Sequence, residues 1–427
     1  MPSPLDAVYL ALLAASAPAL LYKRLRHGKY GESFPGMMGK RLPARPLPLP
    51  REHRCWMHGV SVGETVAAGS VYRHLREQRS GWEFLATTTT ETGQAQARRT
   101  YAGGEHFAYA PADFSWTVDA FLRAYRPSLY LFFETEIWPN LLHALGRRSI
   151  PAFLVNGKVS ERSGRRYARV AFALRGPLSS VRRFYMQTQQ DAERMARILG
   201  GEDRIQVAGN VKFDSLPEPL TADERRAWRA RWGVSDDACV VLAGSTHPGE
   251  EETIWKAFAE ARAQAPGLRL VLAPRHPERF PEVAEFLRRA AGSVHRTSSG
   301  EPAPAGAAVV LLDEMGVLAR AFGAADIAIV AGSWKPDVGG HNLLEAGRHG
   351  IPVLRGPHMH AQPDITRVLG PGQGAPCVEA AELGGTLARL AADPGERRAL
   401  GERARDASTS NLGAARRVVE DLLGRLP

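Results

Sequence analysis

Polar side chains that could carry out proton transfer follow three apolar runs in the first half of the chain. Residues 55–60 lead into Ser61, Gly63 and Glu64, residues 84–89 enter a run of threonines, and residues 129–133 lead into Glu134. Short apolar runs of this kind are typical of buried strands, and in a parallel sheet their polar ends meet at one edge. We therefore expect these groups to gather on one rim, where a carboxylate could accept a proton from a substrate hydroxyl.

Glu64 is open to two interpretations. The Ser61-x-x-Glu64 spacing before a helix-like stretch is typical of a capping box, in which both side chains satisfy free backbone N–H groups. The same position suits a general base, because the dipole at a helix N-terminus keeps a carboxylate ionised. The two roles compete for the same oxygens. For the threonine run and Glu134 the alternatives are helix capping and buried hydrogen bonding.

The second half is rich in features that bind anions. The segments 243–251 (AGSTHPGEE), 273–280 (APRHPERF) and 332–347 (GSWKPDVGGHNLLEAG) each join an apolar run to a helical stretch through a small-residue or polar turn. Such turns offer backbone N–H groups to a phosphate. One of them could be structural, but three on successive strand ends favour a nucleotide site. The candidate side chains and turn residues are Ser245, Thr246, His247, Arg275, His276, Gly340, His341, Asn342 and Glu345.

Other chemistries lack their motifs. The sequence has no G-x-x-x-x-G-K-[ST] loop, no Asp-x-Asp pair and no helical H-x-x-x-H spacing, so we expect neither a metal nor a cofactor. Helix N-termini with Lys212 and Arg275 are then expected to stabilise a departing phosphate. The three cysteines are far apart, which suits a reducing compartment.

The alternation of apolar runs and helical stretches predicts an α/β protein with two doubly wound, Rossmann-like domains that face a cleft. A stretch rich in prolines and acids at 214–224 reads as the linker, and the cleft is the expected ligand site. The expected parts are residues 1–30 (anchor and basic segment), 31–213 (acceptor domain), 214–408 (nucleotide-sugar domain) and 409–427 (a helix returning to the first domain). The expected strands are 55–60, 84–89, 129–133, 152–156, 184–188 and 205–209, then 239–245, 268–274, 309–313, 327–333 and 352–356.

The N-terminal region has the pattern of a membrane anchor. An apolar stretch at 5–22 precedes nine Lys/Arg and only two Glu within 23–54, in a chain of formal net charge +10. Basic residues after an apolar helix place that side in the cytoplasm and attract anionic lipid headgroups. The apolar stretch is about 17 residues, at the lower limit for spanning, so a core helix followed by a solvated basic loop is the alternative. Nucleic-acid binding is not expected, since no helix-turn-helix pattern is present.

Six segments, taken in order and spacing, resemble one family over nearly the whole chain. Residues 61–64, 134–140, 209–214, 245–251, 274–280 and 339–346 are similar to those of the 3-deoxy-D-manno-octulosonic acid (Kdo) transferases of lipopolysaccharide biosynthesis. The resemblance implies a GT-B glycosyltransferase that moves Kdo from CMP-Kdo to a lipid A precursor (lipid IVA). It also implies an inverting, metal-independent reaction at the cytoplasmic face of the inner membrane.

The resemblance also implies roles for particular residues. The family's general base falls on Glu64. The family's CMP contacts fall on Pro274 and Arg275, on Met315, Gly316 and Val317, and on Asn342, Leu343, Leu344 and Glu345.

Two positions depart from the family pattern. Val317 stands where the family has a glutamate, and Lys158 stands where it has an arginine, whose bidentate grip on a carboxylate lysine cannot reproduce. Two alternatives stay open: a GT-B enzyme that uses another nucleotide sugar, and a non-catalytic nucleotide- or lipid-binding relative. The number of Kdo residues transferred cannot be read from the sequence.

Overall fold

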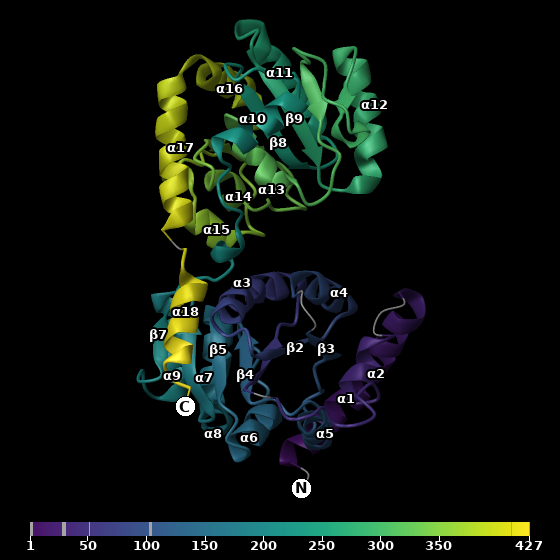
Figure 1. Cartoon of the computed structure of the whole chain (residues 1–427), viewed down its shortest axis with the longest axis vertical. Helices are drawn as coiled ribbons and strands as arrows, with labels where there is room; N and C mark the ends of the chain where they lie inside the picture. Colours follow the sequence, from purple (N-terminus) through teal and green to yellow (C-terminus); the bar gives the residue numbers. More distant parts are fainter. Residues whose placement is uncertain (1–2, 28–30, 51, 102–104, 411, 427) are drawn as a thin grey trace. The chain divides into compact units, whose positions relative to one another are not determined.

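The computed structural model describes residues 3–27, 31–50, 52–101, 105–410 and 412–426. They form two compact units, Met1–Ser215 with Leu412–Pro427, and Leu216–Asn411 (Figure 1). Each unit has its own parallel sheet with helices between successive strands, which confirms the predicted α/β class.

The described strands of the first unit follow the order β3-β2-β1-β4-β5-β6-β7, and every neighbouring pair is parallel. The strands are β1 (Arg54–His58), β2 (Glu83–Thr88), β3 (His106–Tyr109), β4 (Leu129–Phe133), β5 (Ala152–Gly157), β6 (Val181–Met186) and β7 (Ile205–Val207). The helices are α1 (Pro4–His27), α2 (Ser33–Met37), α3 (Val62–Gln78), α4 (Glu91–Thr100), α5 (Ser115–Tyr125), α6 (Pro139–Arg147), α7 (Glu161–Arg169), α8 (Ala171–Leu178), α9 (Gln189–Leu199) and α18 (Ala414–Leu423).

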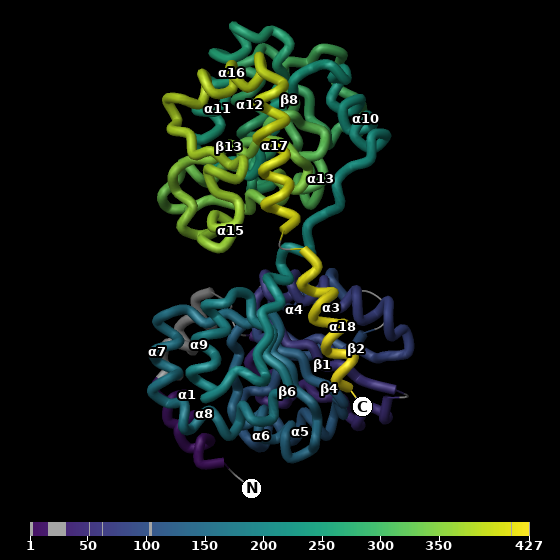
Figure 2. The backbone as a smooth tube through the Cα atoms, turned by 90° about the vertical axis from the view of Figure 1, so that its left-hand side faces the viewer, coloured from purple at the N-terminus to yellow at the C-terminus, as the bar shows by residue number. Residues whose placement is uncertain are grey.

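The central strands β1 and β4 are buried on both faces, which explains their continuous apolar sequence. Alternate residues of β1 point to opposite sides: Cys55 joins one core and Trp56 joins the other. The core on the Cys55 side includes Val418 and Leu422 of α18, and Figure 2 shows this helix beside α3. The Asp214 carboxylate accepts hydrogen bonds from the backbone N–H groups of Gly413 and Ala415 at the start of α18.

The second unit has a parallel sheet in the order β10-β11-β9-β8-β12-β13. Its strands are β8 (Val240–Thr246), β9 (Arg269–Pro274), β10 (His295–Arg296), β11 (Val309–Leu311), β12 (Ile327–Val330) and β13 (Val353–Leu354). Its helices are α10 (Ala222–Arg231), α11 (Glu250–Gln264), α12 (Phe280–Ala291), α13 (Leu318–Ala321), α14 (Leu344–Gly347), α15 (Pro363–Val368), α16 (Leu383–Ala392) and α17 (Pro394–Thr409).

Some elements differ from the prediction. Strands β3 and β10 have no counterpart in it, because both lie at sheet edges and only partly bury their side chains. The stretch read as a linker also ends in structure. Thr221 caps α10, with its hydroxyl accepting from Glu224 N and its own N–H donating to the Glu224 carboxylate, a complete capping box.

The N-terminal helix α1 contacts the first unit through its first two turns. Asp6 accepts hydrogen bonds from the backbone N–H of Ser115 at 2.9 Å and from the Asn140 amide at 3.1 Å, and the Tyr9 hydroxyl donates to Asp113 at 3.0 Å. Within the described ranges, no helix combines the length and the apolar character needed to cross a bilayer. Of the predicted basic segment, Lys29 and Arg51 lie outside the described residues.

Candidate active site

Glu64 lies in the first turn of α3, directly beyond the carboxyl end of β1. Its carboxylate accepts hydrogen bonds from the backbone N–H of Val60 and from the Ser61 hydroxyl, both at 2.9 Å, and Ser61 Oγ accepts from Glu64 N at 3.3 Å. In the predicted capping box the carboxylate would accept from Ser61 N, so the observed bond to Val60 N is one residue earlier. Gly63 is exposed and a Cβ there would meet only Ser61 Oγ, which leaves the helix start open to a ligand.

The surroundings of Glu64 make it a better base than an exposed carboxylate. Its side chain is largely buried, with 8% of the residue exposed. Burial raises the pKa of Glu64, and the Glu134 carboxylate adds to the rise, while the Val60 N–H, the Ser61 hydroxyl and Lys212 oppose it. A carboxylate whose pKa is raised is a stronger proton acceptor than one at its ordinary value.

Two further carboxylates lie close to Glu64. Glu134 directly follows β4 and has a left-handed backbone conformation (φ +59°). Its Oε1 forms an ion pair with Lys212 Nζ at 2.7 Å. Burial raises the pKa of Glu136, with the charges of Glu64 and Glu134 adding to it, although the Trp138 indole donates to this carboxylate at 3.1 Å. The structure brings Ser61, Glu64 and Glu134 together at this rim, and Lys212, which we expected beside a departing phosphate, pairs with Glu134 here.

Buried amides behind the rim hold Lys212 in place. Asn156 at the end of β5 is fully buried, and its Oδ1 accepts from Val211 N at 3.1 Å. Gln187 donates to the Asn156 carbonyl and accepts from the Asn210 amide, and Asn210 Oδ1 in turn accepts from Lys212 N. The sequence analysis did not assign these amides to the site. Their signal in the sequence was the presence of amides at the ends of predicted strands or directly after them.

In the second unit, three histidines meet beyond β8 and β9. His247 and His341 stack with ring centroids 5.1 Å apart and join Nε2 to Nε2 at 2.8 Å, and His276 lies edge-on to His247 at 5.4 Å. Burial, His247, Arg275 and His276 together lower the pKa of His341 to about 4. The pair is therefore neutral at physiological pH, with the N–H of one imidazole donating a hydrogen bond to the ring nitrogen of the other.

A buried carboxylate fixes the turns around these histidines. Glu250, at the start of α11, is 2% exposed and accepts from the backbone N–H groups of His247, Gly332 and Trp334. Gly340, directly before His341, has a left-handed backbone (φ +85°). A Cβ there would lie 2.3 Å from the Met359 sulfur, so this position requires glycine.

Neighbouring predicted residues hold the end of β8. Ser245 has a left-handed backbone (φ +60°), and the buried Thr246 hydroxyl donates to Glu251 at 2.8 Å. The Thr246 carbonyl accepts from Arg275 N at 3.0 Å, which fixes the start of the turn after β9.

Arg275 is the exposed cation of this group, directly after the buried Pro274. Burial raises the pKa of Glu345, while a 3.2 Å hydrogen bond from the Asn342 amide and the charge of Arg275 oppose the rise. Asn342 Oδ1 also accepts from Leu344 N at 3.1 Å. The structure thus brings a cation, neutral imidazoles and a carboxylate to the carboxyl edge of the second sheet.

Not all of the remaining predicted residues have side chains that a ligand could reach. Leu343 and Leu344 are only 0% and 1% exposed, so their side chains belong to the core and only their backbone groups are available to a ligand. Met315, at 57% exposed, and Gly316 (φ +82°) form a turn that ends at Val317, the N-cap of α13. A Cβ on Gly244 of β8 would lie 2.9 Å from Leu318, which puts this turn beside the end of β8.

This architecture, two parallel α/β units with polar groups at the carboxyl ends of their strands, is that of GT-B-like proteins. UDP-GlcNAc 2-epimerase from Neisseria meningitidis, solved bound to UDP-GlcNAc, aligns over 87% of this chain and 100% of that chain. Its TM-score is 0.58 at 14% identity, so the likeness concerns the fold alone.

Sequence comparison defines the family. The family description "3-Deoxy-D-manno-octulosonic-acid transferase (kdotransferase)" matches residues 34–215. The 3-deoxy-D-manno-octulosonic acid transferase of Bordetella pertussis is 35% identical over 98% of this chain and 99% of that protein. The Haemophilus influenzae protein of the same name is 30% identical over 98% of this chain and 94% of that protein. The chain belongs to the 3-deoxy-D-manno-octulosonic acid transferase family, and it is a glycosyltransferase.

Proposed function

We propose that this chain transfers Kdo from CMP-Kdo to a hydroxyl of a lipid A precursor, by an inverting and metal-independent displacement with Glu64 as general base. Family membership supports the transferred sugar, and the resemblance of the six segments supports the donor and the acceptor. The observation that carries the mechanism is the Glu64 carboxylate, which is held at a helix start, largely buried and of raised pKa.

The chemical step follows from the position of Glu64. Its carboxylate exchanges the Ser61 hydroxyl for the acceptor hydroxyl and takes that proton. The acceptor oxygen then forms a bond to the anomeric carbon of Kdo from the face opposite the phosphate. The bond from the anomeric carbon to the phosphate oxygen breaks, its electron pair leaves with CMP, and the anomeric configuration inverts. Positioned proton transfer of this kind contributes about 10²–10⁴-fold to a rate.

Lys212 and Glu134 tune that base. The Lys212 ammonium favours the ionised form of Glu64, whereas Glu134 disfavours it, and the 2.7 Å ion pair between them limits both effects. The balance keeps the pKa of Glu64 raised while the carboxylate remains available.

The donor is assigned to the second unit. Arg275 supplies positive charge for the phosphate, and backbone N–H groups of the turns after β8 and β11 supply further donors. Glu345, whose carboxylate is oriented by Asn342, suits the ribose hydroxyls. Val317 offers no side-chain carboxylate, so its turn contacts the nucleotide through backbone groups.

We further propose that the first helix and the basic segment associate with the anionic cytoplasmic face of the inner membrane. Exposed apolar side chains on one face of α1 include Leu5, Val8 and Leu12, at 37%, 52% and 60%. An apolar helix face followed by basic residues binds at a lipid surface without spanning it.

The test is transfer by the full-length protein in detergent, with freshly generated CMP-Kdo and a tetraacylated lipid A precursor. The product mass is expected to increase by whole Kdo units, and the number of units follows from the same spectrum. Thermal shifts with CMP and with UDP test donor choice separately. Absence of any added mass while CMP still stabilises the protein would contradict the proposed transfer.

A further inference from the structure

Arg355 is a buried cation in the second unit, and it directly follows β13. It is 6% exposed, and its Nη1 donates a hydrogen bond to the Gly356 carbonyl at 3.1 Å. Its Nε is buried without a hydrogen-bond partner, and its guanidinium forms no ion pair within the described ranges. A buried charge without a partner is costly, so this side chain points to an anionic ligand.

The other buried arginines of the chain do not share this property. Within the ranges that the structure describes, four arginines expose less than a tenth of their surface, and three of them form an ion pair with a carboxylate. The three pairs are Arg54 with Glu83, Arg229 with Asp326 and Arg348 with Glu218. Arg355 is the exception, so burial of arginine in this fold is not by itself the explanation.

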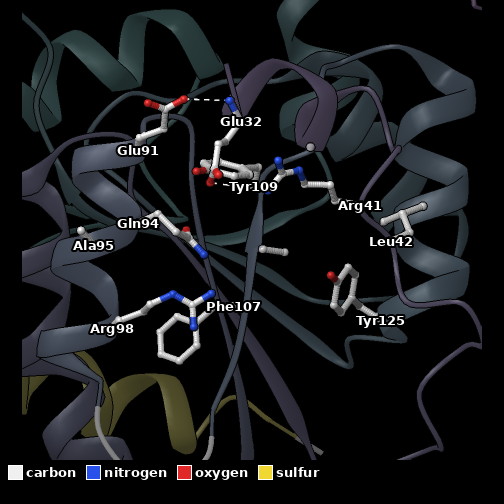
Figure 3. A pocket seen from close by; sticks show the side chains of 12 residues that line it. Glu32, Arg41, Leu42, Glu91, Gln94, Ala95, Arg98, Phe107, Tyr109 and Tyr125 are labelled. Atoms are coloured by element: carbon white, nitrogen blue, oxygen red, sulfur yellow. Dashed lines mark hydrogen bonds and ion pairs between the residues drawn. The ribbon is translucent and has the colours of Figure 1, made fainter. Parts of the chain in front are cut away.

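A cavity of the first unit gives a second contrast. It measures about 330 Å³ and lies beside β3, where Glu32 and Glu91 balance the charges of Arg41 and Arg98 (Figure 3). Arg41 forms an ion pair with Glu32 at 3.5 Å, and Glu91 accepts a hydrogen bond from the backbone N–H of Glu32. This cavity therefore has no unmatched charge for an ionic ligand, whereas Arg355 has one.

The free atoms of Arg355 have the geometry that suits a carboxylate. Nε and Nη2 lie on the same side of the planar guanidinium, and neither donates a hydrogen bond to another described residue. The bond from Nη1 to the Gly356 carbonyl holds the group with this side free. Two parallel N–H groups bind both oxygens of a carboxylate or of a phosphate. The ligand is therefore an anion that can bind in a bidentate way.

The surroundings of Arg355 connect it to the histidine pair of the candidate site. Gly356 N donates to Ser333 Oγ at 2.8 Å, and a Cβ on Gly356 would lie 2.4 Å from the Ser333 carbonyl oxygen. The backbone N–H groups on either side of Ser333 donate to Glu250, the carboxylate that also accepts from His247 N. The end of β13 and the turns around the histidines thus form one set of contacts.

The segment after Arg355 packs against the turn that leads to His341. Ala361 N donates to the Gly339 carbonyl at 3.0 Å, and Met359 lies so close to Gly340 that no Cβ fits there. Ligands of parallel sheets bind outside the carboxyl ends of the strands, and Arg355 stands at such an end. A ligand of Arg355 would therefore lie at the same edge as the proposed nucleotide site.

We propose that Arg355 binds the carboxylate of the donor sugar through Nε and Nη2, and that it determines the specificity of the second unit for a sugar acid. The proposal rests on the proposed function, in which the donor is CMP-Kdo, because Kdo is an octulosonic acid and carries a carboxylate. In that function Arg275 serves the phosphate, so the sugar carboxylate is the anionic group of the donor that still lacks a cation.

The first experiment compares Arg355→Met with Arg398→Met, which replaces an exposed arginine of α17. The KM for freshly generated CMP-Kdo should rise by roughly 10- to 100-fold in Arg355→Met, as for the loss of a hydrogen bond to a charged group. The dissociation constant of CMP alone, measured by calorimetry, should stay at the wild-type value. Arg398→Met should change neither quantity. An unchanged KM, or an equal weakening of CMP and CMP-Kdo, would overturn the proposal.

The unfolding temperature without ligand separates ligand binding from a structural role. Arg355→Met removes a buried charge that has no partner, so the ligand-free variant should unfold at the wild-type temperature or above it. Arg355→Lys keeps the charge but loses the bidentate fork, so it should raise the KM for CMP-Kdo even if Arg355→Met fails to fold. A lower unfolding temperature of Arg355→Lys with an unchanged KM would assign Arg355 to structure and overturn the proposal.

A binding measurement on the full chain separates this proposal from the proposed function, because it needs no turnover. The CMP-saturated protein is titrated with Kdo, with Kdo methyl ester and with inorganic phosphate. Kdo should bind roughly tenfold more tightly than its ester, and Arg355→Met should remove that difference. Equal binding of Kdo and its ester, or phosphate binding as tight as that of Kdo, would overturn the carboxylate assignment. Kdo binding that depends on Arg355 in a protein that transfers nothing would reject the proposed function and support this proposal.

Discussion

Two helix starts in this chain have the same Ser/Thr-x-x-Glu spacing and hold the glutamate differently. At α10, Glu224 accepts from Thr221 N at 2.9 Å. Thr221 is exposed and Glu224 is partly exposed, and that hydrogen bond is the main reason why the pKa of Glu224 is lowered. At α3, the carboxylate of Glu64 turns to Val60 N and the Ser61 hydroxyl, and burial raises its pKa. Burial and neighbouring carboxylates, rather than the spacing, therefore distinguish a candidate base from a cap.

A third helix start extends the comparison. Glu250 also lies three residues after the residue whose N–H it accepts, His247, but it is almost fully buried and accepts from three backbone N–H groups. With only 2% of the residue exposed, this carboxylate is closed to a substrate hydroxyl. We therefore regard Glu250 as structural, although burial raises its pKa too.

The largest difference should appear in turnover. Glu64→Gln removes the proposed base while keeping the size of the side chain, so kcat should fall by about 10²–10⁴-fold. Glu224→Gln changes the same residue type at the partly exposed cap of α10 and should leave kcat unchanged. Initial rates from product mass spectra, with circular dichroism to compare folding, make this test. Equal loss in both variants would show that the two glutamates do not differ in function.

Glu250→Gln should mainly affect stability. Replacing the buried carboxylate turns an amide NH₂ toward backbone N–H groups, which should lower the free energy of unfolding by about 1–3 kcal/mol. The matched control is Glu252→Gln, an exposed glutamate two residues further along α11. Urea unfolding of the full chain measures the change. An unaltered midpoint for Glu250→Gln would mean that the three N–H groups do not depend on the charge.

Lys212→Met should shift the pH dependence of kcat/KM. The proposed mechanism needs ionised Glu64, so activity should fall as pH drops through the pKa of Glu64, which lies above the ordinary value of 4.5. Removing the Lys212 cation takes away a charge that favours the ionised form, so the acid limb should move to higher pH. Lys256→Met, an exposed lysine of α11, makes the same change in net charge. A limb that stays in place or moves to lower pH would contradict the electrostatic role of Lys212.

The smallest effect is expected at the α10 cap. Thr221→Ala should destabilise the chain by about 1 kcal/mol, a usual value for loss of an N-cap hydroxyl, with no change in transfer rate. Ser61→Ala removes a similar cap but also a hydrogen bond to the Glu64 carboxylate, so it should change the rate as well. Thermal unfolding and initial rates of the two variants provide the comparison. A rate change in Thr221→Ala would contradict a purely structural role for this cap.

Much of the fold could be predicted because parallel strands are buried on both faces. Runs such as 129–133 are apolar throughout, and β4 occupies those residues. The prediction failed where burial is incomplete, at the edge strand β3, and where polar composition concealed a helix, at α10. The Thr221-x-x-Glu224 spacing was available as a signal there.

The candidate site could be predicted only as a set of residue types at strand ends. That Glu64, Glu134 and Glu136 influence one another depends on the sheet order, which puts β1 beside β4. The stacking of His247 on His341 joins residues that are 94 positions apart in the sequence. Sheet order and ring packing are tertiary properties, so local patterns did not contain them.

The position of α18 has a consequence for the order in which the chain folds. Its residues 414–423 are made after the whole of the second unit, yet Val418, Val419 and Leu422 are fully buried in the core of the first. Domains usually fold as units while they emerge from the ribosome. Here the unit that is made first must wait with an open groove beside α3, while the unit made second can already complete its own core. During that interval the nascent first unit exposes an apolar surface to the chaperones and proteases of the cell.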